Sequence, residues 1–301
     1  MPLIQVENLN FTYNAGTAFE KKALTDINFS IERGEFIGII GQTGSGKSTL
    51  IMHLNALMKP TSGRVLLDGA DINADKSKLK EIRRRVGIVF QYPERQLFEL
   101  TVKKDAAFGP RNMGLDEAET ETRVREALLS AGIPEALFEK SPFEISGGQK
   151  RRAAIAGVLA MKPEVLILDE PAAGLDPKGR DDILSEIKRM RDELNLTVIL
   201  VSHSMEDIGK LVERILVIND GRIAMTGPPG EIFKNAARLE EIGLAAPQST
   251  YLINELIKRK LYPESADTVY TVDAAISAIE SVLKGNHDDF NPNHDRAVLP
   301  G

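Results

Sequence analysis

The residues with the clearest chemistry form one continuous run, Gly41-Gln42-Thr43-Gly44-Ser45-Gly46-Lys47-Ser48, followed by Thr49. The run follows an apolar segment that ends at Ile40 and opens a helical pattern, which is the context that a phosphate-binding loop requires. Its glycines let successive backbone N–H groups turn toward one anion, and the N-terminus of the following helix adds partial positive charge. Lys47 supplies a full charge, and the Ser48 hydroxyl is placed to ligate Mg²⁺. The run therefore predicts a site for the phosphates of a nucleotide.

Two further apolar segments end in polar residues. Val165–Leu168 is followed by Asp169 and Glu170, and Thr197–Ser202 is followed by His203. Asp169 is predicted to hold Mg²⁺, directly or through water, and Glu170 to orient and deprotonate an attacking water. A histidine at the end of a strand can donate to a phosphate, but a lone histidine is more often structural or exposed, so His203 alone leaves both interpretations open.

The composition of the 301-residue chain excludes other kinds of chemistry. There are 38 Lys+Arg against 44 Asp+Glu, a net charge of -6, which is a poor basis for binding nucleic acid, and we interpret Arg83-Arg84-Arg85 as a solvated helix face. The chain has no Cys, which excludes disulfides, zinc–thiolate sites and cysteine nucleophiles. No apolar run approaches the ~20 residues that span a bilayer, and the N-terminal residues show no leader pattern. We expect a soluble protein of the cell interior that can still sit on a membrane partner.

The elements that must position these groups alternate along the chain. Short apolar runs predict strands buried on both faces, and helical patterns separate them. The strands are Phe36–Ile40, Gly87–Phe90, Val165–Leu168 and Thr197–Ser202, and the helices include Ser48–Leu57, Gln149–Met161 and Lys178–Leu194. This alternation predicts an α/β fold with a parallel sheet. Ahead of it, Leu3–Tyr13 and Ala23–Ile31 alternate apolar and polar residues and predict antiparallel strands, and Asn219-Asp220-Gly221 predicts a late hairpin.

The chain divides into three expected regions. Residues 1–230 form the main domain, with a helical insertion at about residues 91–160. Residues 231–285 form a small helical extension whose two apolar stripes must pack on the core or on a second subunit. The stripes consist of Leu252, Ile253, Leu256, Ile257 and Leu261, and of Val272, Ile276, Ile279 and Leu283. Residues 286–301 are polar and are expected to be disordered.

A second glycine-rich run, Ile145-Ser146-Gly147-Gly148-Gln149, resembles the signature of ATP-binding-cassette (ABC) ATPases. Ser146 can cap the following helix, and Gly147 and Gly148 leave N–H groups open, so the run forms a second anion site. The resemblance extends in order over about residues 3–230. Gln91 resembles the Q-loop glutamine, Ala173-Gly174-Leu175-Asp176 the D-loop, His203 the switch histidine, and Tyr13 the aromatic residue that stacks on adenine.

The ABC resemblance implies a fold and a set of roles. The fold is a P-loop NTPase (RecA-like) core with an N-terminal antiparallel β subdomain and an inserted helical subdomain. Glu170, His203, Lys47 and Gln91 would be catalytic, Tyr13 and the phosphate loop would bind ATP, and Ser48, Gln91 and Asp169 would hold Mg²⁺. Two cassettes meet head to tail in this family, so that Ser146, Gly147, Gly148 and Gln149 close over the ATP of the partner. We interpret Lys150-Arg151-Arg152 either as a strengthening of the local positive field or as a solvated helix face.

A narrower resemblance lies in Gln91-Tyr92-Pro93-Glu94-Arg95-Gln96-Leu97-Phe98, which looks like ATPase subunits of energy-coupling-factor (ECF) importers of vitamins and transition-metal ions. Gln-Tyr-Pro-Glu resembles the second of the two paired ATPases. The segment follows the Q-loop, where the family receives coupling helices of the membrane subunit. Tyr92, Leu97 and Phe98 would supply apolar contacts to this coupling groove, and Glu94 and Arg95 charge. Alternatively, these side chains belong to the core of the helical insertion.

The ECF resemblance implies an ATPase subunit bound peripherally to the cytoplasmic face of the cell membrane. Its implied partners are a second, related ATPase, a transmembrane coupling subunit and, through the complex, a membrane substrate-binding subunit, with no nucleic acid. Two alternatives stay open. One is a homodimeric cobalt or nickel importer ATPase, and the other is an ATP-gated switch protein without a transport role.

Overall fold

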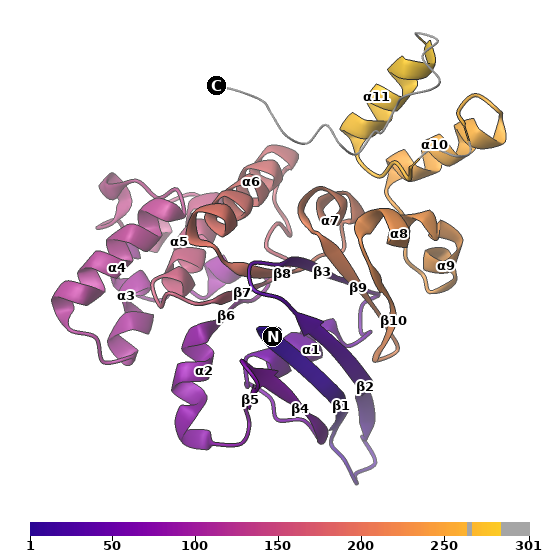
Figure 1. Cartoon of the computed structure of the whole chain (residues 1–301). Coiled ribbons are helices and arrows are strands. Elements are labelled where there is room, and N and C mark those ends of the chain that lie inside the picture. The colour runs from indigo at the N-terminus through magenta and orange to yellow at the C-terminus, as the bar shows by residue number, and fades with distance from the viewer. Residues whose placement is uncertain (264–266, 284–301) are drawn as a thin grey trace.

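The computed structural model describes residues 1–263 and 267–283 (Figure 1). The tail predicted at residues 286–301 lies outside the described residues, as do the last residues of the expected C-terminal extension. None of the helices within these ranges is both long and apolar enough to cross a membrane.

The centre of the molecule is a six-stranded sheet in the order β10-β9-β3-β8-β7-β6. All neighbouring strands are parallel except β9 and β10, which confirms the predicted parallel sheet. Asp220 and Gly221, with φ of 46° and 70°, turn the chain between β9 and β10 in the predicted hairpin. The strands are β3 (Phe36–Ile40), β6 (Val86–Val89), β7 (Val165–Asp169), β8 (Thr197–Val201), β9 (Arg214–Asn219) and β10 (Arg222–Gly227).

A second, antiparallel sheet has the order β2-β1-β4-β5. Its strands are β1 (Ile4–Tyr13), β2 (Lys21–Ile31), β4 (Ser62–Leu67) and β5 (Ala70–Asp71). The first two were predicted from their alternating pattern. The pattern did not predict β4, because its first three residues are exposed and only the last three form an apolar run.

The central sheet is buried on both faces because its side chains alternate between two cores. Ile37 and Ile39 pack toward the antiparallel sheet and α1 (Lys47–Leu54). Phe36 and Ile40 pack in the other core, with residues of α5 (Gly147–Leu159), α6 (Pro177–Leu194) and α7 (Met205–Leu211). A sheet covered on both sides holds its strands firmly, so groups at the strand ends are held in fixed positions.

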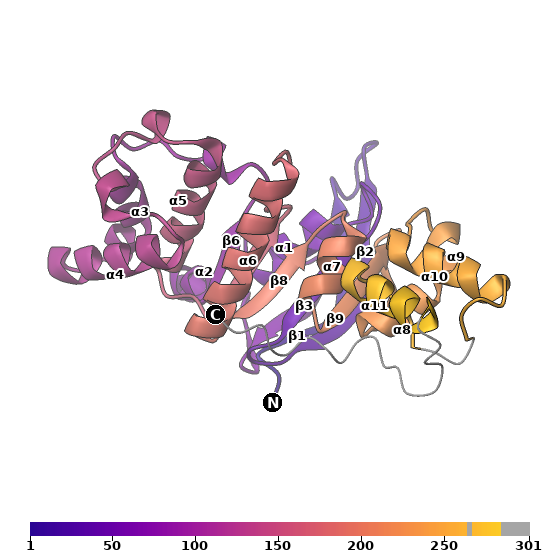
Figure 2. The ribbon, with the colours of Figure 1, turned by 90° about the horizontal axis from the view of Figure 1, so that it is seen from above.

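The remaining helices lie at the two ends of the molecule in both views (Figures 1 and 2). One end consists of α3 (Val102–Asn112), α4 (Glu117–Ser130) and α5, within the region expected for the helical insertion, and near it lies α2 (Leu79–Arg85), which carries the arginine run. The other end consists of α8 (Pro229–Lys234), α9 (Ala236–Glu241), α10 (Gln248–Lys258) and α11 (Val272–Leu283).

The two C-terminal helices pack on each other through part of the expected stripes, since Ile253, Leu256, Ile257 and Ile279 belong to or pack against one small cluster. In α10, Ile253 is buried, but Leu252 is exposed. In α11, the buried residues are Ala274, Ala275 and Ala278, and the larger side chains of Val272, Ile276 and Leu283 are exposed. The alanine face packs because small side chains let α11 approach its neighbour closely. Of the Val272 stripe only Ile279 packs within the described part of this chain, and packing of the three exposed residues on a second subunit stays a prediction.

Candidate nucleotide site

The phosphate loop joins β3 to α1 at the carboxyl edge of the parallel sheet. Gly46 caps α1 with a φ of 112°, and a Cβ there would lie 2.8 Å from the carbonyl oxygen of Ala23, so only glycine fits. The Lys47 ammonium donates to the carbonyl oxygens of Gly41 at 2.6 Å and Gln42 at 2.9 Å. Burial lowers the pKa of Lys47, and the carboxylates that follow β7 oppose this shift. The loop thus encloses a positive charge next to the free N–H groups of a helix N-terminus.

The first candidate carboxylate, Asp169, is the last residue of β7. Its Oδ2 accepts a hydrogen bond from Ser48 Oγ at 3.4 Å. Burial raises the pKa of Asp169, while the Ser48 hydrogen bond and the charge of Lys47 act in the opposite direction. The phosphate loop and the strand end are therefore in direct contact, as the sequence predicted.

These two oxygens fit Mg²⁺. A hydroxyl and a carboxylate are the hard donors that Mg²⁺ takes from proteins, and phosphate oxygens and water complete its shell. Within the described ranges no cluster of three or more His, Cys, Asp or Glu residues is present that could hold a metal by itself. Ser48 and Asp169 fit a metal that arrives with a nucleotide. Gln91 is exposed beyond the end of β6, and its expected part in binding Mg²⁺ stays a prediction.

The second carboxylate, Glu170, is paired with the histidine from the neighbouring strand. Glu170 has a left-handed φ of 52°, and its Oε1 is buried without a hydrogen bond, 3.4 Å from His203 Nε2. Burial, and then the charge of Asp169, raises the pKa of Glu170 to about 7, and burial and Lys47 lower the pKa of His203. Near neutral pH the histidine is therefore uncharged, so the contact is not an ion pair. A buried carboxylate of raised pKa beside an imidazole is suited to accept a proton from water.

Two hollows open beside these groups. One, of about 430 Å³, lies between Glu170, His203 and the residues that follow each of them. The other, of about 470 Å³, lies between Gln42, His203 and the C-terminal connector at residues 243–245. No pattern in the sequence predicted that this connector reaches the phosphate loop. Loops distant in sequence meet here because the parallel strands end at one edge.

Two other predicted residues occupy defined positions. The Tyr13 hydroxyl lies 3.1 Å from Thr49 Oγ1, which places the aromatic ring beside α1. Asp176 caps α6, with Oδ1 accepting from the Gly179 N–H at 2.7 Å. Stacking of Tyr13 on adenine and a D-loop role for Asp176 stay predictions.

The second anion site has the predicted local geometry. Ser146 caps α5 with a reciprocal pair of bonds, in which Ser146 Oγ accepts from Gln149 N–H and Gln149 Oε1 accepts from Ser146 N–H. A Cβ at Gly147 or Gly148 would meet nothing within 4 Å, so both face open space. No signature residue lines either of the two hollows described above. Closure of this site over a partner's nucleotide stays a prediction.

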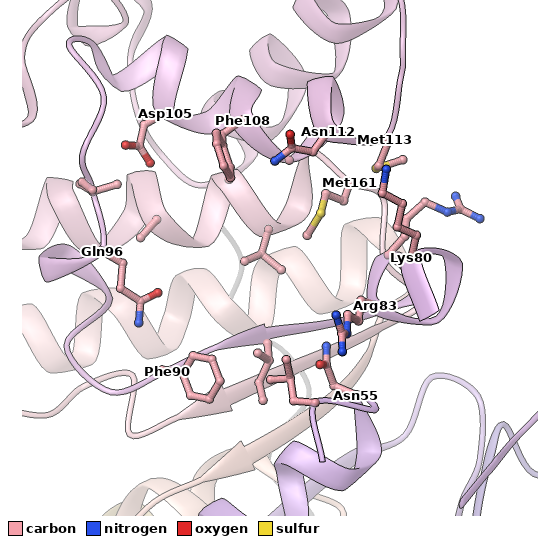
Figure 3. A pocket seen from close by; sticks show the side chains of 18 of the residues that line it. Asn55, Lys80, Arg83, Phe90, Gln96, Asp105, Phe108, Asn112, Met113 and Met161 are labelled. Atoms are coloured by element: carbon pink, nitrogen blue, oxygen red, sulfur yellow. The ribbon is translucent and has the colours of Figure 1, made fainter. Parts of the chain in front are cut away.

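A third hollow, of about 490 Å³, lies between β6, α2, α3 and α5 (Figure 3). Two of the five residues expected to form a coupling groove line this hollow, and its role as such a groove stays a prediction. Leu97 and Phe98 line it, and the Phe98 ring, 64% exposed, meets Phe108 edge to face at a centroid distance of 5.0 Å. The Asp105 carboxylate accepts from the N–H groups of Phe98 and Glu99, which fixes this strip of chain.

Three residues that were expected to contribute to the coupling groove do not line this hollow in the described structure, namely Tyr92, Glu94 and Arg95. The Glu94 carboxylate binds Arg151, and the Arg95 guanidinium lies over the Tyr92 ring, 4.7 Å from its centroid. The short helical turn Pro93–Arg95 rotates these side chains away from the groove.

The interpretation of Arg151 as part of a solvated helix face is also wrong, whereas a strengthening of the local positive field stays a prediction. Only 3% of the Arg151 side chain is exposed. It was missed because its sequence neighbours Lys150 and Arg152 are also basic, and a basic run is typical of a solvated helix face. No local signal in the sequence distinguishes Arg151 from them.

Comparison with known proteins agrees with this geometry. Residues 24–173 match the family described as ABC transporter. The chain is 56% identical to the energy-coupling factor transporter ATP-binding protein EcfA2 of Clostridium acetobutylicum, over 93% of this chain and 98% of the relative, and 56% identical to EcfA2 of Caldanaerobacter subterraneus subsp. tengcongensis, over 94% and 98%.

Solved structures agree as well. CbiO1 of Clostridium perfringens, part of the ABC transporter complex cbiONQ, superposes with a TM-score of 0.72 at 40% identity, over 85% of this chain and 99% of that one. The ATP-binding cassette MJ0796, a dimer in a post-hydrolysis state with ADP and Pi, gives 0.67 at 32% identity, over 75% and 98%. The chain therefore belongs to the ABC transporter family, as an ATP-binding and ATP-hydrolysing subunit of the energy-coupling-factor type.

Proposed function

We propose that this cassette and a second, related ATPase enclose ATP between the phosphate loop of one and the signature of the other. Two helix N-termini in the chain suit an anion, at Lys47 and at Ser146, and they belong to different parts of the fold. The phosphate loop forms only one half of the proposed ATP site, and the signature of the partner supplies the other half. The dimeric structure of MJ0796 supports this arrangement by analogy.

Within each composite site, different residues of this chain bind the phosphates, the adenine and the metal and activate the attacking water. Lys47 and the loop N–H groups bind the phosphates, and Tyr13 stacks on adenine. Ser48 and Asp169, with Gln91, would hold Mg²⁺, which when bound neutralises charge on the phosphates. Glu170 Oε1 accepts a proton from the attacking water.

The imidazole beside Glu170 supplies the complementary hydrogen bond. His203 Nε2 donates to an oxygen of the γ-phosphate, and in the structure the same nitrogen lies 3.4 Å from Glu170 Oε1. Opening and closing of the dimer then moves the groove lined by Leu97 and Phe98, which receives a helix of a transmembrane coupling subunit.

The proposed partners determine where the subunit is located and what the transporter imports. The subunit sits peripherally on the cytoplasmic face of the membrane, and a separate membrane subunit binds the vitamin or other micronutrient. The names of the EcfA2 relatives and of the cbiONQ complex support this assignment. The net charge of -6 and the pairing of Arg85 with acidic residues argue against a nucleic-acid partner.

The observation that carries the proposal is the buried, unpaired Glu170 Oε1 beside His203, next to the Ser48–Asp169 contact. We expect Glu170→Gln, in the complex assembled with its membrane subunits, to bind ATP normally and to lose about 10²–10⁴-fold in steady-state hydrolysis. Glu126→Gln, at an exposed glutamate on α4, is the matched control and should hydrolyse normally. Undiminished turnover by Glu170→Gln would remove Glu170 from the mechanism.

The composition of the same purified complex tests the partners. A second, related ATPase in equal amount supports the heterodimer, whereas this chain alone as a pair supports the homodimeric metal importer. Recovery of soluble partners only would contradict a transport role.

A further inference from the structure

Arg151 stands out because it is a buried cation that the phosphate chemistry does not use. It lies on α5, shortly after the signature, and its guanidinium is saturated with partners from two distant segments. Nε and Nη2 donate to the Glu94 carboxylate at 3.0–3.1 Å, and Nη1 donates to the carbonyl oxygens of Pro171 and Ala173, each at 2.9 Å. A planar guanidinium with five donors can hold two such segments at once, which an ammonium cannot.

The two carbonyls belong to the turn that directly follows Glu170. Ala173 N–H donates to the Glu170 carbonyl at 3.1 Å, and Leu175 N–H donates to the Ala172 carbonyl at 3.3 Å. Glu170 itself has a left-handed φ of 52°, which costs energy in a non-glycine residue and persists only where the surroundings impose it. The bonds from Arg151 are therefore part of what fixes the direction of the Glu170 side chain.

The other partner, Glu94, connects this turn to the coupling groove. It lies in the helical turn Pro93–Arg95, and the same strip of chain continues to Leu97 and Phe98, which line the groove. A second contact runs in parallel, since a Cβ built on Gly174 would lie 3.6 Å from Cε1 of Tyr92. The strip that borders the groove is thus packed on the turn after Glu170 at two points.

We infer that Arg151 is a positioning residue for ATP hydrolysis, which sets the position of Glu170 according to the position of Glu94 and hence of the groove. Arg151 binds the turn through two carbonyls and the groove strip through one carboxylate. It does not touch the phosphate loop in the described structure. The inference rests on the proposed role of Glu170 as the group that activates water.

The test compares variants in the assembled transporter. Arg151→Gln should lower kcat at least tenfold and leave KM for ATP within about threefold, because the phosphate loop is untouched. Arg151→Lys should recover little of this loss, because one ammonium cannot reach the carboxylate and both carbonyls. Glu94→Gln, which keeps the carbonyl bonds, should show an intermediate loss and serves if Arg151→Gln does not assemble.

Arg214→Gln is the matched control. It breaks the pairing of Arg214 with Glu35 at the amino ends of β9 and β3, away from the nucleotide site. We expect its kcat to stay within twofold of the parent. A loss of kcat as large as that of Arg151→Gln would show a general effect of removing an arginine that holds a carboxylate and would overturn the inference, as would an unchanged kcat in Arg151→Gln.

Hydrogen exchange measures how well the backbone amides of the turn after Glu170 are protected. This measurement does not depend on whether Glu170 is the base. The amides of Ala173 and Leu175 should exchange faster in Arg151→Gln than in the parent and in Arg214→Gln. Unchanged exchange would overturn the inference. If Glu170→Gln kept full turnover while these amides lost protection in Arg151→Gln, the role of Glu170 would be wrong and the contact between Arg151 and the turn would stand.

Discussion

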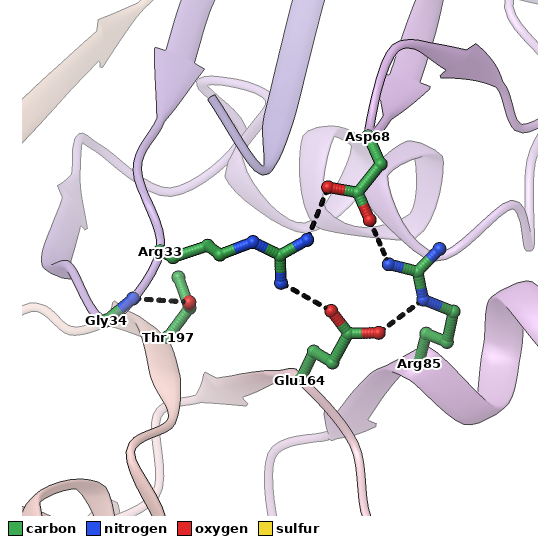
Figure 4. Close-up of polar contacts among 6 residues, drawn as sticks. All are labelled: Arg33, Gly34, Asp68, Arg85, Glu164 and Thr197. Atoms are coloured by element: carbon green, nitrogen blue, oxygen red, sulfur yellow. Dashed lines mark hydrogen bonds and ion pairs between the residues drawn. The ribbon is translucent and has the colours of Figure 1, made fainter. Parts of the chain in front are cut away.

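Replacement of Glu164 by Gln should weaken the junction between the two sheets. The Glu164 carboxylate lies in a ring of alternating charges with Arg33, Asp68 and Arg85 (Figure 4). Its Oε2 accepts from Arg33 Nη1 at 2.6 Å, its Oε1 accepts from Arg85 Nε, and Asp68 binds the same two arginines. Asp68 follows β4 of the antiparallel sheet, whereas Glu164 precedes β7 of the central sheet, so the ring ties one sheet to the other.

The size of the effect follows from the pKa of Glu164. Hydrogen bonds, first from Arg85 and then from Arg33, lower it from 4.5 to about 2 against the opposing effect of burial. At about 1.4 kcal/mol per pKa unit, the full shift would correspond to about 3 kcal/mol. The side chains of Glu164 and Arg33 are 35% and 55% exposed, so solvent screens much of this energy. We expect Glu164→Gln to cost about 1 kcal/mol at neutral pH, which lowers Tm by roughly 2–4 °C.

The pH dependence gives the sharper test. The folded-state pKa of Glu164 lies below its unfolded value, so the ionised carboxylate is the stabilising form. Its contribution is present above about pH 5 and is lost as the pH falls toward about 2. Thermal unfolding followed by circular dichroism, from about pH 7 down to about pH 3, should show a constant difference in Tm between parent and Glu164→Gln down to about pH 5 and a shrinking difference below it. The control is Glu241→Gln, at an exposed pair with Arg238. A difference that is absent at neutral pH, equal in the control, or constant down to about pH 3 would refute the reasoning.

Two further substitutions probe the edges of the nucleotide site. Gly243→Ala should raise the Kd for ATP several-fold in a fluorescence titration, because the φ of Gly243 is 68° and a Cβ there would lie 1.5 Å from Gln42 Nε2. Gly230→Ala is the control and should bind ATP normally, because its Cβ would lie 3.6 Å from the nearest atom. Equal affinities of the two variants would contradict the expectation. Phe98→Ser should reduce recovery of the transmembrane subunit in a detergent pull-down without changing the affinity for ATP. Leu129→Ser, at an exposed residue of α4, is the control and should leave this recovery unchanged. Unchanged recovery with Phe98→Ser would remove this ring from the docking surface.

The parts of this molecule that were predictable from sequence are those set by short-range patterns. A glycine-rich loop after an apolar strand, carboxylates after Leu168 and a histidine after Ser202 all lie at strand ends, and parallel strands bring their carboxyl ends to one edge. The contact of Ser48 with Asp169 agrees with the shared Mg²⁺ role expected for them, whereas the contact of Glu170 with His203 was not predicted although it obeys the same rule. A hairpin at Asp220 was equally local, because two left-handed residues suffice to form it.

Other parts could not be predicted because they depend on which surfaces meet. The α11 stripe of Val272 and Ile276 is more apolar than the alanine face, yet Ala274 and Ala278 are the buried residues. Hydrophobic periodicity shows that a helix has an apolar face, but the partner's shape decides which side is buried. The connector at Gly243 likewise reaches Gln42 only through the tertiary fold, and no spacing in the sequence indicates it.

The segment Tyr92–Phe98 was in part predicted incorrectly, and the difference between its predicted and its observed side-chain positions bears on function. The sequence predicts that five of its side chains together line the groove or together belong to the core of the helical insertion, but Tyr92 has a left-handed φ of 56° and starts a helical turn. The turn divides the strip, so that Leu97 and Phe98 face the groove and Glu94 faces Arg151. A helix that presses on the groove therefore pushes on the same few residues that hold the turn after Glu170. On the mechanism we propose, movement at the membrane side would reach Glu170 through one buried guanidinium, that of Arg151, without a long path through the core.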